Sequence, residues 1–126
     1  NENFTAYWCK MPSDKIDMLR ALGRDPLVIK ETRIDALAGL TDLMDTALAS
    51  APLQKGPLLL LYGGREEIIP NEATERFLKG LPHPAIQQMR HYENGYHMLL
   101  RDLDPEKPLS DILDYLASKS IRGSTK

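Results

Sequence analysis

The sequence predicts an α/β fold with a parallel sheet, and three observations support this prediction. Residues 58–62 are four leucines and a tyrosine without alternation, which is typical of a strand buried on both faces of a parallel sheet. Residues 85–92 are a second strand candidate, and a helical pattern separates the two segments. Because a parallel pair needs such a crossover, we expect the two strands to be parallel neighbours.

Helical periodicity dominates the chain before the first strand. A helix is expected over residues 13–23, with Ser13 or Asp14 as its N-cap. A longer amphipathic helix is expected over residues 33–51, where apolar side chains recur every three or four positions, and Pro52 ends it.

The pattern changes after residue 52, and we therefore divide the chain into a helical segment, 1–52, and an α/β segment, 53–126. Within the second segment, a helix is expected over residues 70–80, between the two strands. A final helix is expected after the turn at residues 104–105.

Composition excludes several classes of partner. The net charge of -2 gives no electrostatic basis for binding nucleic acid or an anionic membrane surface, and no apolar run is long enough to span a bilayer. A single cysteine, Cys9, excludes an internal disulfide and fits a reducing compartment, so we expect a cytoplasmic protein. The histidines and the cysteine lack a metal-ligand spacing, and we expect neither a metal nor a cofactor.

A sheet of two strands is incomplete. The strand at residues 58–62 has the composition of a central strand, which normally has a paired neighbour on both sides. An open edge of this kind invites association with more protein. The chain therefore reads as one half of a larger sheet, or as a domain that forms a homo-oligomer through the open edge.

Two segments that follow the strands carry residues suited to chemistry. Glu66 lies in residues 63–70 (GGREEIIP), and His97 lies in residues 95–102 (GYHMLLRD). Parallel α/β sheets build their sites at the carboxyl ends of the strands, so we expect the carboxylate within hydrogen-bond distance of a ring nitrogen. An acid and a histidine placed in this way are two members of a three-part nucleophilic site.

With these two motifs the chain resembles the α/β-hydrolase superfamily, most closely the branch of monoacylglycerol lipases, lysophospholipases and serine aminopeptidase-type hydrolases. The resemblance covers nearly the whole chain. It implies the C-terminal part of that fold, with residues 13–51 in a helical cap inserted before the last two strands. It also implies that Glu66 is the catalytic acid and His97 the catalytic base, acting on a lipid-like or other small ester.

The resemblance also implies a nucleophile that this sequence does not contain. These enzymes carry a serine in a G-x-S-x-G elbow upstream of the acid. We therefore expect the elbow to precede residue 1, in the N-terminal half of the same hydrolase, and the chain alone to be inactive. The serines of the chain, none of which lies between glycines in that pattern, are Ser13, Ser50, Ser110, Ser118, Ser120 and Ser124.

Other interpretations of the same residues stay open. Glu66 stands where the family usually has Asp, and Glu67 is a rival for the same role. Both carboxylates could be solvated charges at the start of a helix, and His97 could be a surface histidine. Arg101 and Asp102 are expected to form a local ion pair.

Three functions are therefore in competition. The first is a serine ester hydrolase, with a peptidase as its variant if the cleft is lined by acidic residues. The second is a non-catalytic relative that acts as a binding or interaction module. The third is a self-contained small α/β domain that dimerises through its open sheet edge.

Overall fold

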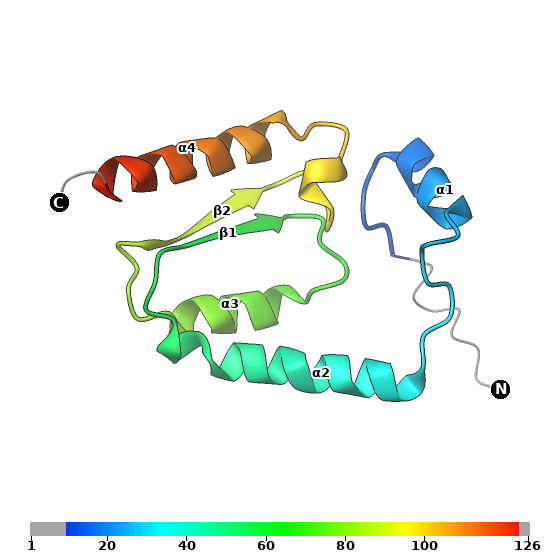
Figure 1. Ribbon diagram of the computed structural model, residues 1–126, viewed down its shortest axis with the longest axis horizontal. Coiled ribbons are helices and arrows are strands. Elements are labelled where there is room, and N and C mark those ends of the chain that lie inside the picture. Colours follow the sequence, from blue (N-terminus) through cyan, green and yellow to red (C-terminus); the bar gives the residue numbers. More distant parts are fainter. Residues whose placement is uncertain (1–9, 124–126) are drawn as a thin grey trace.

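The computed structural model describes the backbone of residues 10–123 and the side chains up to residue 119 (Figure 1). Helices and strands follow the predicted order. In chain order, the elements are α1 (Ile16–Arg24), α2 (Ile34–Ala49), the 3-10 turn η2 (Ala51–Leu53), β1 (Leu58–Gly63), α3 (Asn71–Gly80), β2 (Gln87–Tyr92), the 3-10 turn η3 (Leu99–Arg101) and α4 (Glu106–Gly123).

The two strands form the predicted parallel pair. Their register runs from Leu58 opposite Gln87 to Gly63 opposite Tyr92, and α3 provides the crossover between them. Figure 1 shows α4 along one side of the strands and α3 with α2 along the other. Both strands end toward α1 and η3, so the segments that follow them lie together at one edge of the sheet.

The helix boundaries agree with the sequence patterns within a few residues, apart from the start of α1. This helix begins at Ile16, and its N-cap is Lys15, which makes no side-chain capping bond. Neither Ser13 nor Asp14 is the N-cap, so that prediction was wrong. No helix among the described residues is both long enough and apolar enough to cross a bilayer.

The second strand begins two residues later than predicted, at Gln87. The backbone N–H groups of Ile86 and Gln87 both donate to the carbonyl of His83, at 3.0 Å each, and this turn delays the strand. Gln87 is buried, and both ends of its side-chain amide have hydrogen-bond partners. The amide nitrogen donates to the carbonyl of Gln54 at 2.5 Å, and the amide oxygen accepts from the N–H of His83 at 2.8 Å.

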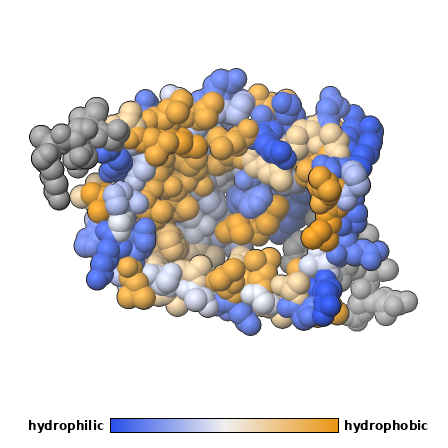
Figure 2. Space-filling view, in the orientation of Figure 1, coloured by the Kyte–Doolittle hydropathy of each residue, from blue (hydrophilic) through white to orange (hydrophobic). Residues whose placement is uncertain are grey.

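Burial over the sheet is shallow. Within the described part of the chain, the buried apolar residues are Ala51, Tyr62 and Leu99. The four leucines of β1 are only half-buried, although strands of this composition are normally covered on both faces. Figure 2 shows a broad hydrophobic surface over the part of the view where the strands and α4 lie. The fold therefore presents an apolar face of the kind that packs against more protein.

Candidate active site

The loops that follow β1 and β2 contact each other backbone to backbone. The N–H of Arg65 donates to the carbonyl of Gly95 at 2.9 Å, and the N–H of Gly64 donates to the carbonyl of Tyr92 at 2.7 Å. A Cβ atom placed on Gly63 would lie 2.3 Å from the oxygen of Gly95. Glycine at the end of β1 therefore permits an approach that no larger residue could make.

This approach brings the predicted acid and histidine together. Glu66 Oε2 lies 2.7 Å from His97 Nδ1, so the predicted contact is present. The other carboxylate oxygen accepts the backbone N–H groups of Ile68 at 2.6 Å and Ile69 at 3.1 Å. The Glu66 side chain is 6% exposed and the His97 side chain 37% exposed, so a buried acid holds a ring that solvent or substrate can reach.

The electrostatics of this pair fix its hydrogen positions. Burial alone would raise the pKa of Glu66, but the hydrogen bonds from His97, Ile68 and Ile69 outweigh it and hold that pKa below its usual range. Glu66 is therefore ionised at neutral pH and can only accept, so His97 Nδ1 carries the hydrogen. In the neutral ring this leaves the lone pair on His97 Nε2, and among the described residues no hydrogen bond occupies that atom.

The rival carboxylate, Glu67, has a different role. We call residues 10–14 the strap, because this segment crosses both loops. The N–H of Met11 donates to Glu67 Oε2 at 3.1 Å, and Lys10 Nζ donates to the carbonyl of Glu67. Glu67 thus holds the strap, and Glu66 alone of the two contacts His97.

The strap also holds the chain that follows His97. Ser13 is fully buried there, and its hydroxyl also accepts the N–H of Lys15, the N-cap of α1, at 3.2 Å. Sequence reasoning could not find the contacts that hold the chain after His97, because the partners are nearly ninety positions apart. The three bonds join Met98 N to Pro12 O (2.7 Å), Ser13 Oγ to Arg101 O (3.1 Å) and Leu103 N to Asp14 Oδ1 (2.8 Å).

The predicted ion pair between Arg101 and Asp102 is wrong for the described residues, where no such contact occurs. Asp102 is instead turned inward and is only 6% exposed. Its Oδ2 accepts the backbone N–H of Tyr96, the residue before His97, at 2.8 Å. Arg101 remains exposed because the inward carboxylate is not available to it.

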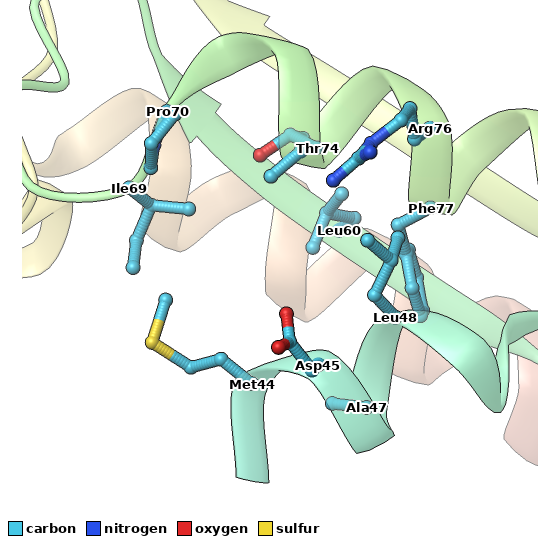
Figure 3. Close-up of a pocket in the computed structure, with 11 residues that line it drawn as sticks. Met44, Asp45, Ala47, Leu48, Leu60, Ile69, Pro70, Thr74, Arg76 and Phe77 are labelled. Carbon is cyan, nitrogen blue, oxygen red and sulfur yellow. The ribbon is translucent and has the colours of Figure 1, made fainter. Parts of the chain in front are cut away.

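Two apolar pockets flank the loop that carries Glu66. The strap pocket, of about 490 Å³, lies between the strap, α1 and Ile68. The helix pocket, of about 400 Å³, lies between α2, β1, α3 and the Ile69–Pro70 step. In Figure 3, Met44 and Leu48 of α2 lie across this pocket from α3, with Leu60 of β1 beside them.

The charged residues that line the strap pocket are lysines. Among the described residues these are Lys10 and Lys30, and no carboxylate is among the lining residues there, although Glu67 Oε2 accepts the N–H of the lining residue Met11. Lys30 Nζ donates to the carbonyls of Leu22 at 3.2 Å and Asp25 at 3.0 Å, so it is held in place at the pocket. In the part of the chain that the structure describes, no group of three or more His, Cys, Asp or Glu residues could hold a metal ion.

Comparison with known protein families identifies the family of this chain. The family model described as serine aminopeptidase, S33, matches residues 5–104. This range contains both strands, the strap, Glu66 and His97. Because the match spans most of the chain, the protein belongs to the serine aminopeptidase S33 family of the α/β-hydrolase superfamily.

Proposed function

We propose that this chain is the C-terminal portion of a serine hydrolase that cleaves carboxylic esters, similar to a lysophospholipase or a monoacylglycerol lipase. In this proposal residues 1–52 form the cap segment and residues 53–126 the end of the catalytic core. The observation that carries the proposal is the 2.7 Å contact between Glu66 and His97 at the ends of adjacent parallel strands.

The mechanism follows from the tautomer of the ring. His97 Nε2 takes the proton of a serine hydroxyl as that oxygen attacks the ester carbonyl, and later gives the proton to the leaving alcohol. Glu66 holds Nδ1–H and stabilises the imidazolium that forms in between. The serine and the donors that bind the oxyanion, worth about 3 kcal/mol each, come from the upstream half. This chain alone is then inactive.

The incomplete sheet supports an upstream half. The leucines of β1 are only half-buried, and each described strand has a single neighbour. The sequence contains no G-x-S-x-G elbow. Further strands beside this pair would cover the leucines and would supply the missing serine at the same edge of the sheet.

The strap pocket favours an apolar ester over a peptide, whereas the helix pocket has both Asp45 and Arg76 among its lining residues. Recognition of a free amino terminus needs a carboxylate, and the strap pocket has only lysines among its charged lining residues. Its other lining residues, including Met11, Leu19 and Ile68, suit an acyl chain. The family model is described by an aminopeptidase activity, and the lysines of the strap pocket support the ester hydrolase over that peptidase variant.

A non-catalytic relative is the second candidate. Two observations favour it, namely a glutamate at the position of the usual aspartate and the absence of the serine elbow from this sequence. In such a protein the Glu66–His97 contact would only stabilise the two loops, and the pockets would bind a ligand without cleaving it.

Intact mass spectrometry of the parent preparation, with and without a serine-directed fluorophosphonate, tests the proposal. We expect one adduct on a larger chain that contains this sequence, or on an N-terminal fragment that copurifies with it. The adduct should be lost in the variant His97→Ala and after heat denaturation. A folded preparation that contains the N-terminal half and gives no adduct would favour the non-catalytic relative.

The substrate class needs a separate measurement. We expect the active preparation to hydrolyse p-nitrophenyl octanoate and to leave aminoacyl p-nitroanilides intact. Preference for the anilides would assign the peptidase variant instead, even with the serine adduct present.

A further inference from the structure

We infer that Asp102 is a positioning residue for His97, because its buried carboxylate holds the backbone of the histidine loop through the N–H of Tyr96. Asp102 touches neither the ring nor Glu66. It acts on the residue just before His97, and so fixes the point from which the imidazole extends. The use of His97 as a catalytic base rests on the proposed function, whereas the positioning does not.

The loop before His97 is held from two directions. From the β1 side, the N–H of Arg65 donates to the carbonyl of Gly95 at 2.9 Å. From the other side, Asp102 Oδ2 accepts the N–H of Tyr96 at 2.8 Å. Both bonds therefore hold the one peptide group between Gly95 and Tyr96, and the bond from the Met98 N–H to the Pro12 carbonyl, at 2.7 Å, holds the peptide group after His97. The side-chain torsions of His97 are restricted by its bond to Glu66.

Among the described residues, the bond from the Tyr96 N–H is the one hydrogen bond that the Asp102 carboxylate makes. The residue is 6% exposed, and its second oxygen, Oδ1, is buried without a hydrogen-bond partner there. A buried carboxylate with one hydrogen bond opposes folding, whereas an apolar side chain of similar size would not. An apolar side chain could not accept the Tyr96 N–H, so this contact is what the carboxylate provides.

The strap fixes the backbone on both sides of Asp102. Ser13 Oγ donates to the carbonyl of Arg101 at 3.1 Å, and the N–H of Leu103 donates to Asp14 Oδ1 at 2.8 Å. Asp102 lies between these two anchored residues with its side chain turned inward. The strap, Asp102, Tyr96 and His97 thus form one continuous series of contacts that ends at Glu66.

Proton NMR of the parent preparation tests this inference without any turnover. The readout is the downfield resonance of His97 Nδ1–H, which is identified by its loss in the variant Glu66→Gln. In Asp102→Ala we expect this hydrogen to exchange with water about tenfold faster, since one fixing hydrogen bond is removed. In Asp102→Asn we expect the wild-type rate, because the amide oxygen can still accept the Tyr96 N–H.

Asp104→Ala is the matched control, since Asp104 is an exposed carboxylate two residues further along the same loop. It should leave the resonance unchanged. The inference would be overturned if this hydrogen exchanged as slowly in Asp102→Ala as in wild type. It would also be overturned if exchange in Asp104→Ala were accelerated as much as in Asp102→Ala.

A measurement on the wild type covers the case in which Asp102→Ala does not fold. The Tyr96 amide should exchange at least about tenfold more slowly than the same amide in a free peptide. Exchange at the free-peptide rate would show that Asp102 does not hold it. Failure of fluorophosphonate labelling would leave both results standing, so the two proposals fail separately.

Discussion

At the scale of single residues, the site depends on glycines that let two loops touch. We expect Gly63→Ala to lower the free energy of unfolding by about 1–3 kcal/mol, because its methyl group would overlap the Gly95 carbonyl. Gly39→Ala, in α2, has nothing within 4 Å of the new methyl group and should raise it by about 0.5–1 kcal/mol. Urea denaturation of both variants checks the pair, and equal effects would contradict the overlap.

The Glu66 carboxylate makes the stability of the fold depend on pH. Its pKa in the folded protein lies below the ordinary value of 4.5, so its contribution is present above that value and is lost as the pH falls through the folded-state pKa. We expect Glu66→Gln to reduce the free energy of unfolding at pH 7, and the difference from wild type to shrink as the pH falls below 4.5 and through the folded-state pKa.

Chemical denaturation at several pH values between 7 and 3 measures this difference. Glu93→Gln is the control, because Glu93 is an exposed carboxylate on the neighbouring loop and makes no side-chain hydrogen bond among the described residues. A difference between wild type and Glu66→Gln that stays constant over this range would show that the charge of Glu66 contributes nothing.

The sequence predicted some of these residues and not others. Glu66 and His97 could be predicted because each follows a strand, and parallel strands end at the same edge of a sheet. Choosing between Glu66 and Glu67 needed the structure, since neighbouring carboxylates differ only in where the loop turns them. Asp102 was predicted to form a surface ion pair because local sequence does not show whether a side chain faces inward.

At the scale of elements, a half-buried phenol joins β2 to α4. Tyr92 Oη donates to Asp111 Oδ2 at 2.8 Å, and Lys107 Nζ donates to the other oxygen at 2.5 Å. Burial, then the hydrogen bond and the charge of Asp111, raise the pKa of Tyr92 to about 12. The contact therefore stabilises the fold while the phenol is neutral, and this contribution is lost as the pH rises through about 12.

Titration of the tyrosine absorbance at 295 nm tests this contact. We expect wild type and Tyr92→Phe to give the same absorbance at pH 10.5, because Tyr92 is still protonated there, and to differ by one tyrosinate above pH 12. In guanidinium chloride, where the contact is broken, the two proteins should already differ at pH 10.5. If folded Tyr92→Phe already absorbed less than folded wild type at pH 10.5, by the amount of one tyrosinate, the contact would be contradicted.

The order and type of the elements were largely predictable, and their ends were less so. The unbroken apolar run at residues 58–62 and the helical spacing before Pro52 are strong local signals. The start of β2 could not be predicted from local sequence. It depends on a turn at His83 and on a bond from the Gln87 side chain to the distant carbonyl of Gln54. The start of α1 also depends on distant residues. Ser13 and Asp14, at the end of the strap, bond to Arg101 and Leu103.

At the scale of the whole molecule, the apolar face of the fold predicts association. Several exposed apolar residues lie on α4, among them Leu109, Leu113 and Leu116, which are 49–58% exposed. We expect sedimentation velocity of this chain alone to show concentration-dependent self-association. We also expect the chain to bind an apolar dye, as measured by the fluorescence of the dye. Addition of the upstream half of the hydrolase should suppress both, because it would cover the same face.

Two outcomes would contradict this prediction. A monomer that binds no dye would show that the apolar face is already covered in the isolated chain. A discrete, cooperatively unfolding dimer that does not take up an upstream half would favour a self-contained domain that pairs through its open sheet edge.

The strap also determines when this site can form during synthesis. Asp14 and Leu103 are 89 positions apart, and a ribosome that adds about 5–20 residues per second needs on the order of ten seconds to make the second after the first. During that interval the strap lacks its partners at Met98, Arg101 and Leu103, and Glu67 is the one distant partner of the strap, among the described residues, that is made within it. A nascent chain therefore carries the apolar strand β1 before the strap can hold the loop that contains His97.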